Sequence, residues 1–68
     1  MTNDMLADVI SAIMEAADEV KKKADQDDQD YGQLLAYAET LSIIQDACTA
    51  DEQKEIGLDF DIDKRYLL

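Results

Sequence analysis

The stretch "DQDDQD", Asp25–Asp30, contains no apolar residue and separates two segments that both have helical periodicity. A run of polar residues that breaks such a pattern is typical of a loop. Because a short connection makes two helices antiparallel neighbours, this stretch predicts a helical hairpin. Asp30 is the expected N-cap of the second helix, with Asp28 as the alternative.

The segment before the loop has the pattern of an amphipathic helix over about residues 4–24. Asn3 and Asp4 suit the N-terminus of a helix, and Lys21–Lys23 suit its negative C-terminal end. Apolar side chains recur mainly at intervals of three and four residues, as on one face of a helix. They are Leu6, Val9, Ile10, Ile13, Ala17, Val20 and Ala24.

This apolar face is wide. At about 100° per residue, Met5, Ala12 and Ala16 extend it on one side and Met14 on the other, to roughly half of the circumference. One neighbouring helix would not cover that arc. We therefore expect the C-terminal tail, a second subunit or a partner to pack there, and a dimer of hairpins would give a four-helix core.

A second helix is predicted over about residues 31–48. Its main apolar line consists of Tyr31, Leu34, Tyr37, Ala38, Leu41, Ile44 and Cys48. A second, weaker line on roughly the opposite side consists of Gly32, Ala36, Ile43 and Ala47. Small residues there would let another helix backbone come close, although the line also fits a solvent face with one exposed isoleucine.

The remaining residues predict a short third helix and an extended tail. Thr49 and Glu52 have the spacing of a capping box, and Gly57 suits a helix C-terminus, so a helix is expected over about residues 50–56. In the tail, residues 57–68, the stretch "LDFDID" alternates apolar and acidic side chains, which predicts an extended segment with one apolar face. The tail could pack on its own hairpin, pair with another chain, stay disordered or turn helical near its end. The expected fold of residues 1–68 is a single small all-α domain.

The composition restricts the setting of the chain. Its 17 acidic and six basic residues give a net charge of −11, which disfavours direct binding to nucleic acid or to anionic membranes. Residues 1–24 carry five carboxylates, so they fit neither a signal peptide nor a membrane span. Cys48 is the only cysteine, which favours a reducing, cytoplasmic location.

Neither a metal site nor a catalytic site is expected. The chain lacks histidine and offers one thiol, so a tetrahedral zinc site is disfavoured. A calcium loop starting at Asp59 would place Lys64 where glycine is required. One starting at Asp27 has Gly32 at the glycine position but Gln29, Tyr31 and Ala38 at three of the ligand positions. Weak, nonspecific ion binding by "DQDDQD" stays open. No nucleophile–base pair or glycine-rich phosphate loop is recognisable, so we expect neither enzymatic activity nor a cofactor.

The stretches "YGQLLAYAETLSIIQDA", Tyr31–Ala47, and "GLDFDIDKRYL", Gly57–Leu67, resemble small uncharacterised acidic proteins of bacteria, phages and mobile elements. In those proteins a helical hairpin precedes a short C-terminal extension. The resemblance covers about half of the chain and implies a bacterial or phage accessory protein. It supplies no catalytic or binding motif.

These observations together predict a small protein-interaction or structural module that forms a homodimer or binds another protein. The candidate contact residues are Met5, Val9, Ala12, Ala16, Gly32, Ala36, Ile43, Ala47, Leu58, Phe60 and Ile62. The alternative is an acidic inhibitor that mimics nucleic acid and occupies the basic cleft of a DNA- or RNA-binding protein.

Overall fold

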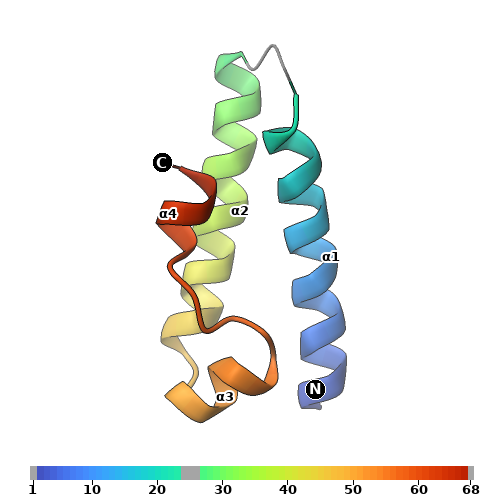
Figure 1. The fold of residues 1–68 in the computed structure, drawn as a ribbon, viewed down its shortest axis with the longest axis vertical. Coiled ribbons are helices and arrows are strands. Elements are labelled where there is room, and N and C mark those ends of the chain that lie inside the picture. The colour runs from blue at the N-terminus through green and yellow to red at the C-terminus, as the bar shows by residue number, and fades with distance from the viewer. Residues whose placement is uncertain (1, 24–26, 68) are drawn as a thin grey trace.

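The computed structural model describes residues 2–23 and 27–67, and this part of the chain contains four helices and no strand (Figure 1). Two long helices, α1 (Asn3–Lys21) and α2 (Asp28–Asp46), run side by side in opposite directions. Two short helices, α3 (Ala50–Glu55) and α4 (Ile62–Tyr66), then return along the hairpin. The predicted all-α hairpin is therefore confirmed.

The N-cap of α1 is Thr2 rather than Asn3. The Thr2 hydroxyl accepts a hydrogen bond of 3.2 Å from the backbone N–H of Met5, which satisfies one of the free donors of the first turn. Asn3 is instead the first helical residue, and its side-chain amide donates to the Glu55 carboxylate of α3. The helix ends at Lys21, whereas the expected end at residue 24 lies outside the described residues.

The predicted start of the second helix was wrong by one turn. Asp27 is the N-cap, and its carboxylate accepts from the Asp30 N–H at 2.8 Å. The Asp30 carboxylate in turn accepts from the Asp27 N–H at 3.3 Å, which completes a capping box with aspartate in the usual glutamate position. Asp30 is almost fully buried, and the Lys23 ammonium lies 2.9 Å from its carboxylate. This ion pair with Lys23 favours a helix that includes Asp30 in its first turn over one that begins after Asp30.

The third helix follows its local signals. Thr49 and Glu52 form the predicted capping box: the Glu52 N–H donates to the Thr49 hydroxyl at 3.2 Å, and the Thr49 N–H donates to the Glu52 carboxylate at 2.9 Å. The bond from the Thr49 N–H, followed by the Thr49 side chain, holds the pKa of the Glu52 carboxyl below its usual value. Gly57 has a φ of 75°, and the two N–H groups of Gly57 and Leu58 bond back to the last turn. Glycine takes this left-handed conformation without steric cost, so the helix ends there.

The predicted extended tail was only half right, because residues 62–66 form helix α4. The Asp61 carboxylate caps this helix by accepting from the Lys64 N–H at 3.1 Å. A lone strand would leave its backbone groups unpaired, whereas a helical turn satisfies part of them internally. The turn also places Ile62 and Tyr66, four residues apart, on one buried face.

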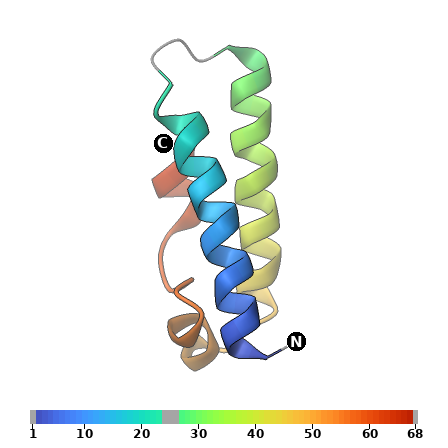
Figure 2. The same ribbon diagram turned by 90° about the vertical axis from the view of Figure 1, so that its right-hand side faces the viewer.

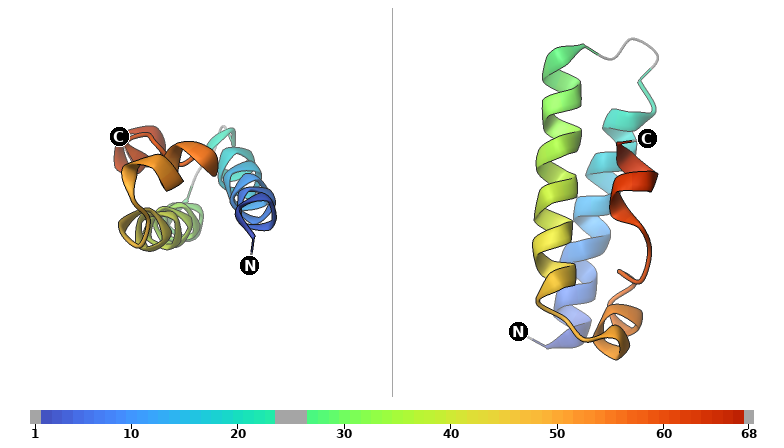
Figure 3. Two further views of the ribbon diagram at one scale, coloured as in Figure 1. Left: turned by 90° about the horizontal axis from the view of Figure 1, so that it is seen from below. Right: turned by 90° about the vertical axis from the view of Figure 1, so that its left-hand side faces the viewer.

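The C-terminal segment, residues 57–67, completes the core. Seen along the hairpin, α1, α2 and the returning chain form the three corners of a triangle, and side views show the segment lying along one face of the hairpin (Figures 2 and 3). The buried apolar side chains between these layers are Ile10, Ala17, Val20, Leu34, Ala38, Leu41, Ile56, Leu58, Ile62 and Tyr66. The C-terminal segment of the same chain thus covers one side of the hairpin. It is one of the three occupants expected for the wide apolar face, beside a second subunit and a partner.

Candidate functional site

Among residues 2–23 and 27–67, five large apolar side chains stay exposed after the C-terminal segment has packed. They are Met5, Val9, Tyr31, Leu35 and Ile43, and the last has 70% of its surface open to solvent. Single exposed apolar residues are ordinary on any protein surface. Here, however, four of the five belong to two continuous surfaces, which we call the α2–α4 groove and the α1 stripe.

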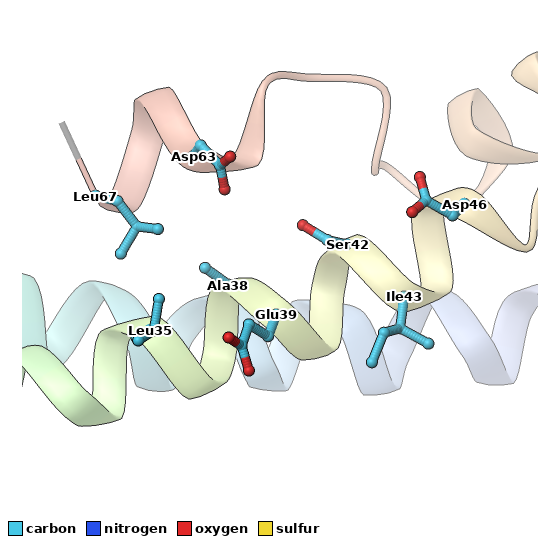
Figure 4. Close-up of a pocket in the computed structure, with 8 residues that line it drawn as sticks. All are labelled: Leu35, Ala38, Glu39, Ser42, Ile43, Asp46, Asp63 and Leu67. Atoms are coloured by element: carbon cyan, nitrogen blue, oxygen red, sulfur yellow. The ribbon is translucent and has the colours of Figure 1, made fainter.

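The α2–α4 groove is a cavity of about 500 Å³ between α2 and the end of the C-terminal segment (Figure 4). Its long wall comes from α2, and Asp63 and Leu67 overhang it from the other side. The residues that line it are Leu35, Ala38, Glu39, Ser42, Ile43, Asp46, Asp63 and Leu67. An apolar floor with a few polar groups at the edge is typical of a binding site.

The charges around this groove all have the same sign. Glu39, Asp46 and Asp63 are exposed carboxylates, and no basic side chain is among the lining residues. None of the ion pairs recorded within residues 2–23 and 27–67 uses these three carboxylates. The groove therefore combines an apolar floor with an uncompensated negative edge.

The α1 stripe consists of Met5, Val9, Ala12 and Ala16. Their spacing of four, three and four residues places them on one face of α1. The first three are exposed and Ala16 is half-buried, so the helix arc that looked too wide for one neighbour remains partly uncovered. The C-terminal segment and α2 between them cover the rest, including Ile10, Ala17 and Val20.

The small residues of the second α2 line face solvent in the part of the chain that the structure describes. Gly32, Ala36 and Ala47 are exposed, and a Cβ placed on Gly32 would meet no other atom within 4 Å. Nothing in the described fold therefore requires glycine at this position. Ile43, the large member of this line, instead lines the α2–α4 groove.

The three apolar residues of the tail lie against their own hairpin. Leu58 and Ile62 are fully buried in the core, with 0% and 3% of their surfaces exposed, so in this state they offer no surface to a partner. Phe60 is half-buried, and Asp59, Asp61 and Asp63 face solvent. Of the alternatives for the tail, the structure has the segment packed in cis.

Gln45, which sequence reasoning missed, fastens this segment to α2. Its side-chain amide donates to the backbone carbonyls of Leu58 at 2.9 Å and Phe60 at 2.8 Å. Gln45 follows Ala38 and Leu41 by seven and four residues, so it is a polar residue on an apolar helix face. That mismatch is the signal that could have identified it.

Arg65 fixes the other end of the segment. Its guanidinium lies 3.3 Å from the Asp18 carboxylate and stacks over the rings of Phe60 and Tyr66, with centroid distances of 5.3 and 5.4 Å. Such stacking adds a cation–π attraction to the ion pair. The Tyr66 hydroxyl is buried near Asp18 and Arg65 without a well-aligned hydrogen bond to either, and burial raises the pKa of this phenol.

The described part of the chain offers no further site chemistry. It contains no group of three or more carboxylate or thiol side chains arranged to hold a metal ion, and Cys48 is an unpaired, half-buried thiol. Within the same residues, none of the helices is both long and apolar enough to cross a membrane. Comparisons with protein-family models, with curated proteins and with solved structures give no match.

Proposed function

We propose that this chain is a non-enzymatic, acidic protein-interaction module that works in the cytoplasm. The observation that carries the proposal is the apolar surface left open by a fold that is otherwise closed. The C-terminal segment buries its own apolar residues, yet Met5, Val9, Leu35 and Ile43 stay exposed in the α1 stripe and the α2–α4 groove. Clustered exposed apolar surface is a common mark of an interaction site.

Self-association through the α1 stripe is part of this proposal. Small side chains at Ala12 and Ala16 would let a second copy of α1 approach closely, with Met5 and Val9 packing at one end. Each copy carries a net charge of −11, so the two copies repel each other at low ionic strength. Added salt screens this repulsion, and apolar contacts are little weakened by salt.

The experiment is light scattering over a wide protein concentration range at low and at high sodium chloride. We expect the mass to move from monomer toward dimer with concentration, and further so in high salt. The double variant Met5→Ser, Val9→Ser should shift it back to monomer, while Tyr31→Ser, exposed but outside the stripe, should not. A monomeric mass under every condition would remove the homodimer from the proposal.

The second candidate is an acidic mimic of nucleic acid. The charge distribution favours it, because among the described carboxylates only those of Asp18, Glu19 and Asp30 have a recorded basic partner. Most of the 17 acidic residues are therefore available to a basic cleft. Salt separates the two candidates: capture of a basic DNA-binding protein should weaken steeply with sodium chloride, whereas association through apolar contacts should persist.

A further inference from the structure

We infer that the α2–α4 groove is a docking site for a cationic amphipathic helix of a partner protein. The inference rests on the proposed interaction function and specifies the chemistry of the partner. It does not involve the α1 stripe, so the two surfaces are tested separately.

The shape of the groove fits a helix. Its α2 wall runs from Leu35 to Asp46, which is 12 residues and therefore about 17 Å from the first to the last at the rise of an α-helix. A docked helix of about three turns has the same length. Leu35 and Ile43, eight residues apart on α2, provide the exposed apolar contacts of that wall, whereas Ala38 between them is buried in the core. Apolar side chains about two turns apart on one face of a ligand helix would reach both.

The opposite wall is fixed before any ligand arrives. Leu67 lies above the Leu35 end of the groove, and Asp63 lies above Ala38 (Figure 4). Both belong to the segment that Gln45 fastens to α2 and that the Arg65–Asp18 pair holds against α1. A preformed wall lowers the ordering cost of binding.

Charge complementarity selects the partner. Three exposed carboxylates edge the apolar floor, and the lining includes no base. Lysine or arginine on either side of the apolar face of a ligand helix would meet these carboxylates. A second copy of this chain is a poor occupant, because it brings a net charge of −11 to an edge that is already negative. Nucleic acid and anionic membranes are disfavoured for the same reason.

The experiment titrates the full chain into a fluorescently labelled peptide and follows its anisotropy. The peptide is a helix of about 12 residues, with leucines three and four residues apart on one face and lysines beside them. One control peptide has the same composition with the leucines distributed around the helix. A second control replaces every lysine with glutamate. We expect the first peptide to bind and both controls to bind at least tenfold more weakly.

Three variants locate the site. Ile43→Ser should weaken binding about tenfold, because it removes the most exposed apolar contact while leaving the buried core intact. The pair Glu39→Lys, Asp46→Lys should weaken it further, and most strongly at low salt. Val9→Ser reports whether the peptide binds at the α1 stripe instead. The control Tyr31→Ser, exposed and outside both surfaces, should leave the affinity unchanged. Circular dichroism checks that each variant stays helical.

The remaining outcomes overturn the inference. Equal binding of the ordered and redistributed peptides would mean that charge alone attracts them and that the groove recognises nothing. A loss of binding in Val9→Ser but not in Ile43→Ser would move the site to the α1 stripe and leave the interaction function standing. No binding to the wild-type chain would remove the groove as a site for this helix class, while the light-scattering result still decides self-association independently.

Discussion

Gln45 should be worth more to stability than its half-buried position on α2 suggests. Its amide makes two hydrogen bonds, of 2.9 and 2.8 Å, to carbonyls 13 and 15 residues further along the chain. An intramolecular hydrogen bond contributes about 0.5–1.5 kcal/mol net, so losing both should cost about 1–3 kcal/mol. Gln45→Met keeps a side chain of similar length and removes both donors. For a domain of this size, each kcal/mol corresponds to roughly 4–8 °C in Tm.

Gln45→Glu gives a second, pH-dependent form of the same test. Its carboxylate would face the oxygens of Leu58 and Phe60, so at neutral pH we expect a larger loss than in Gln45→Met. When protonated, the new carboxyl becomes a donor and regains one bond. Its pKa in the folded state should therefore lie above the unfolded value of about 4.3. The regained stability is fully present below that unfolded pKa and is lost as the pH rises through the folded pKa.

The assay is urea unfolding followed by far-UV circular dichroism at neutral and at acid pH, with Gln33→Met as the control. Gln33 is exposed on the same helix, so its replacement should leave the midpoint nearly unchanged. Limited proteolysis adds a local readout, because a released C-terminal segment should be cut faster than the hairpin. A Gln45→Met midpoint equal to that of the wild type would refute the role of Gln45 as the fastener. A gap between Gln45→Glu and Gln45→Met that does not narrow in acid would refute the donor argument.

Three further predictions follow from the same contacts. Leu41→Ala should lower the free energy of unfolding by about 2–5 kcal/mol because Leu41 is fully buried. Ile13→Ala, at a half-buried position, should lower it by less, and equal losses in urea unfolding would contradict this order. The hydrogen bond between Asp30 and Lys23, followed by the bond from the Asp27 backbone, keeps the pKa of the Asp30 carboxyl below its usual 3.8. The stability that this carboxylate contributes is therefore present above pH 3.8 and is lost as the pH falls through the folded pKa. Asp30→Asn should therefore lower Tm at pH 7 but not in strong acid, and an equal drop at both pH values would argue against the ion pair. Tyr66→Phe should raise the free energy of unfolding by roughly 1 kcal/mol, since it removes a buried hydroxyl that has no well-aligned hydrogen bond, although Asp18 and Arg65 lie near it. A loss of stability in thermal melts would mean that the hydroxyl is bonded to one of them in solution.

The sequence determined the helical hairpin and the third helix because their signals act over a few residues. Apolar periodicity defines the buried faces of α1 and α2, and the boundaries of α3 follow from Thr49, Glu52 and Gly57. A capping side chain reaches an N–H only two or three residues away, and a left-handed glycine ends the helix that immediately precedes it. Such signals can be recognised without knowing what packs against them.

The first turn of α2 and the end of the tail were decided by competition between local signals. Asp27 and Asp30 can both cap a helix. Asp27 is the cap in the structure, and Asp30, inside the first turn, accepts from Lys23 across the loop. In the tail, alternation from Leu58 to Ile62 and a spacing of four from Ile62 to Tyr66 favour different structures. The chain uses both in turn, extended and then helical, with the Asp61 cap between them.

Tertiary structure alone decided which apolar surface is covered and which stays open. Each pair, Leu58 with Ile62 and Leu35 with Ile43, is one leucine and one isoleucine, so residue type alone makes both equally suitable for contacting a partner. Leu58 and Ile62 are nevertheless buried, whereas Leu35 and Ile43 are exposed. The difference comes from the route of the C-terminal segment, which Gln45 and the Arg65–Asp18 pair fix through contacts 13 to 47 residues apart. Local periodicity carries no information about contacts at such separations, because they form only when the folded chain brings those residues together.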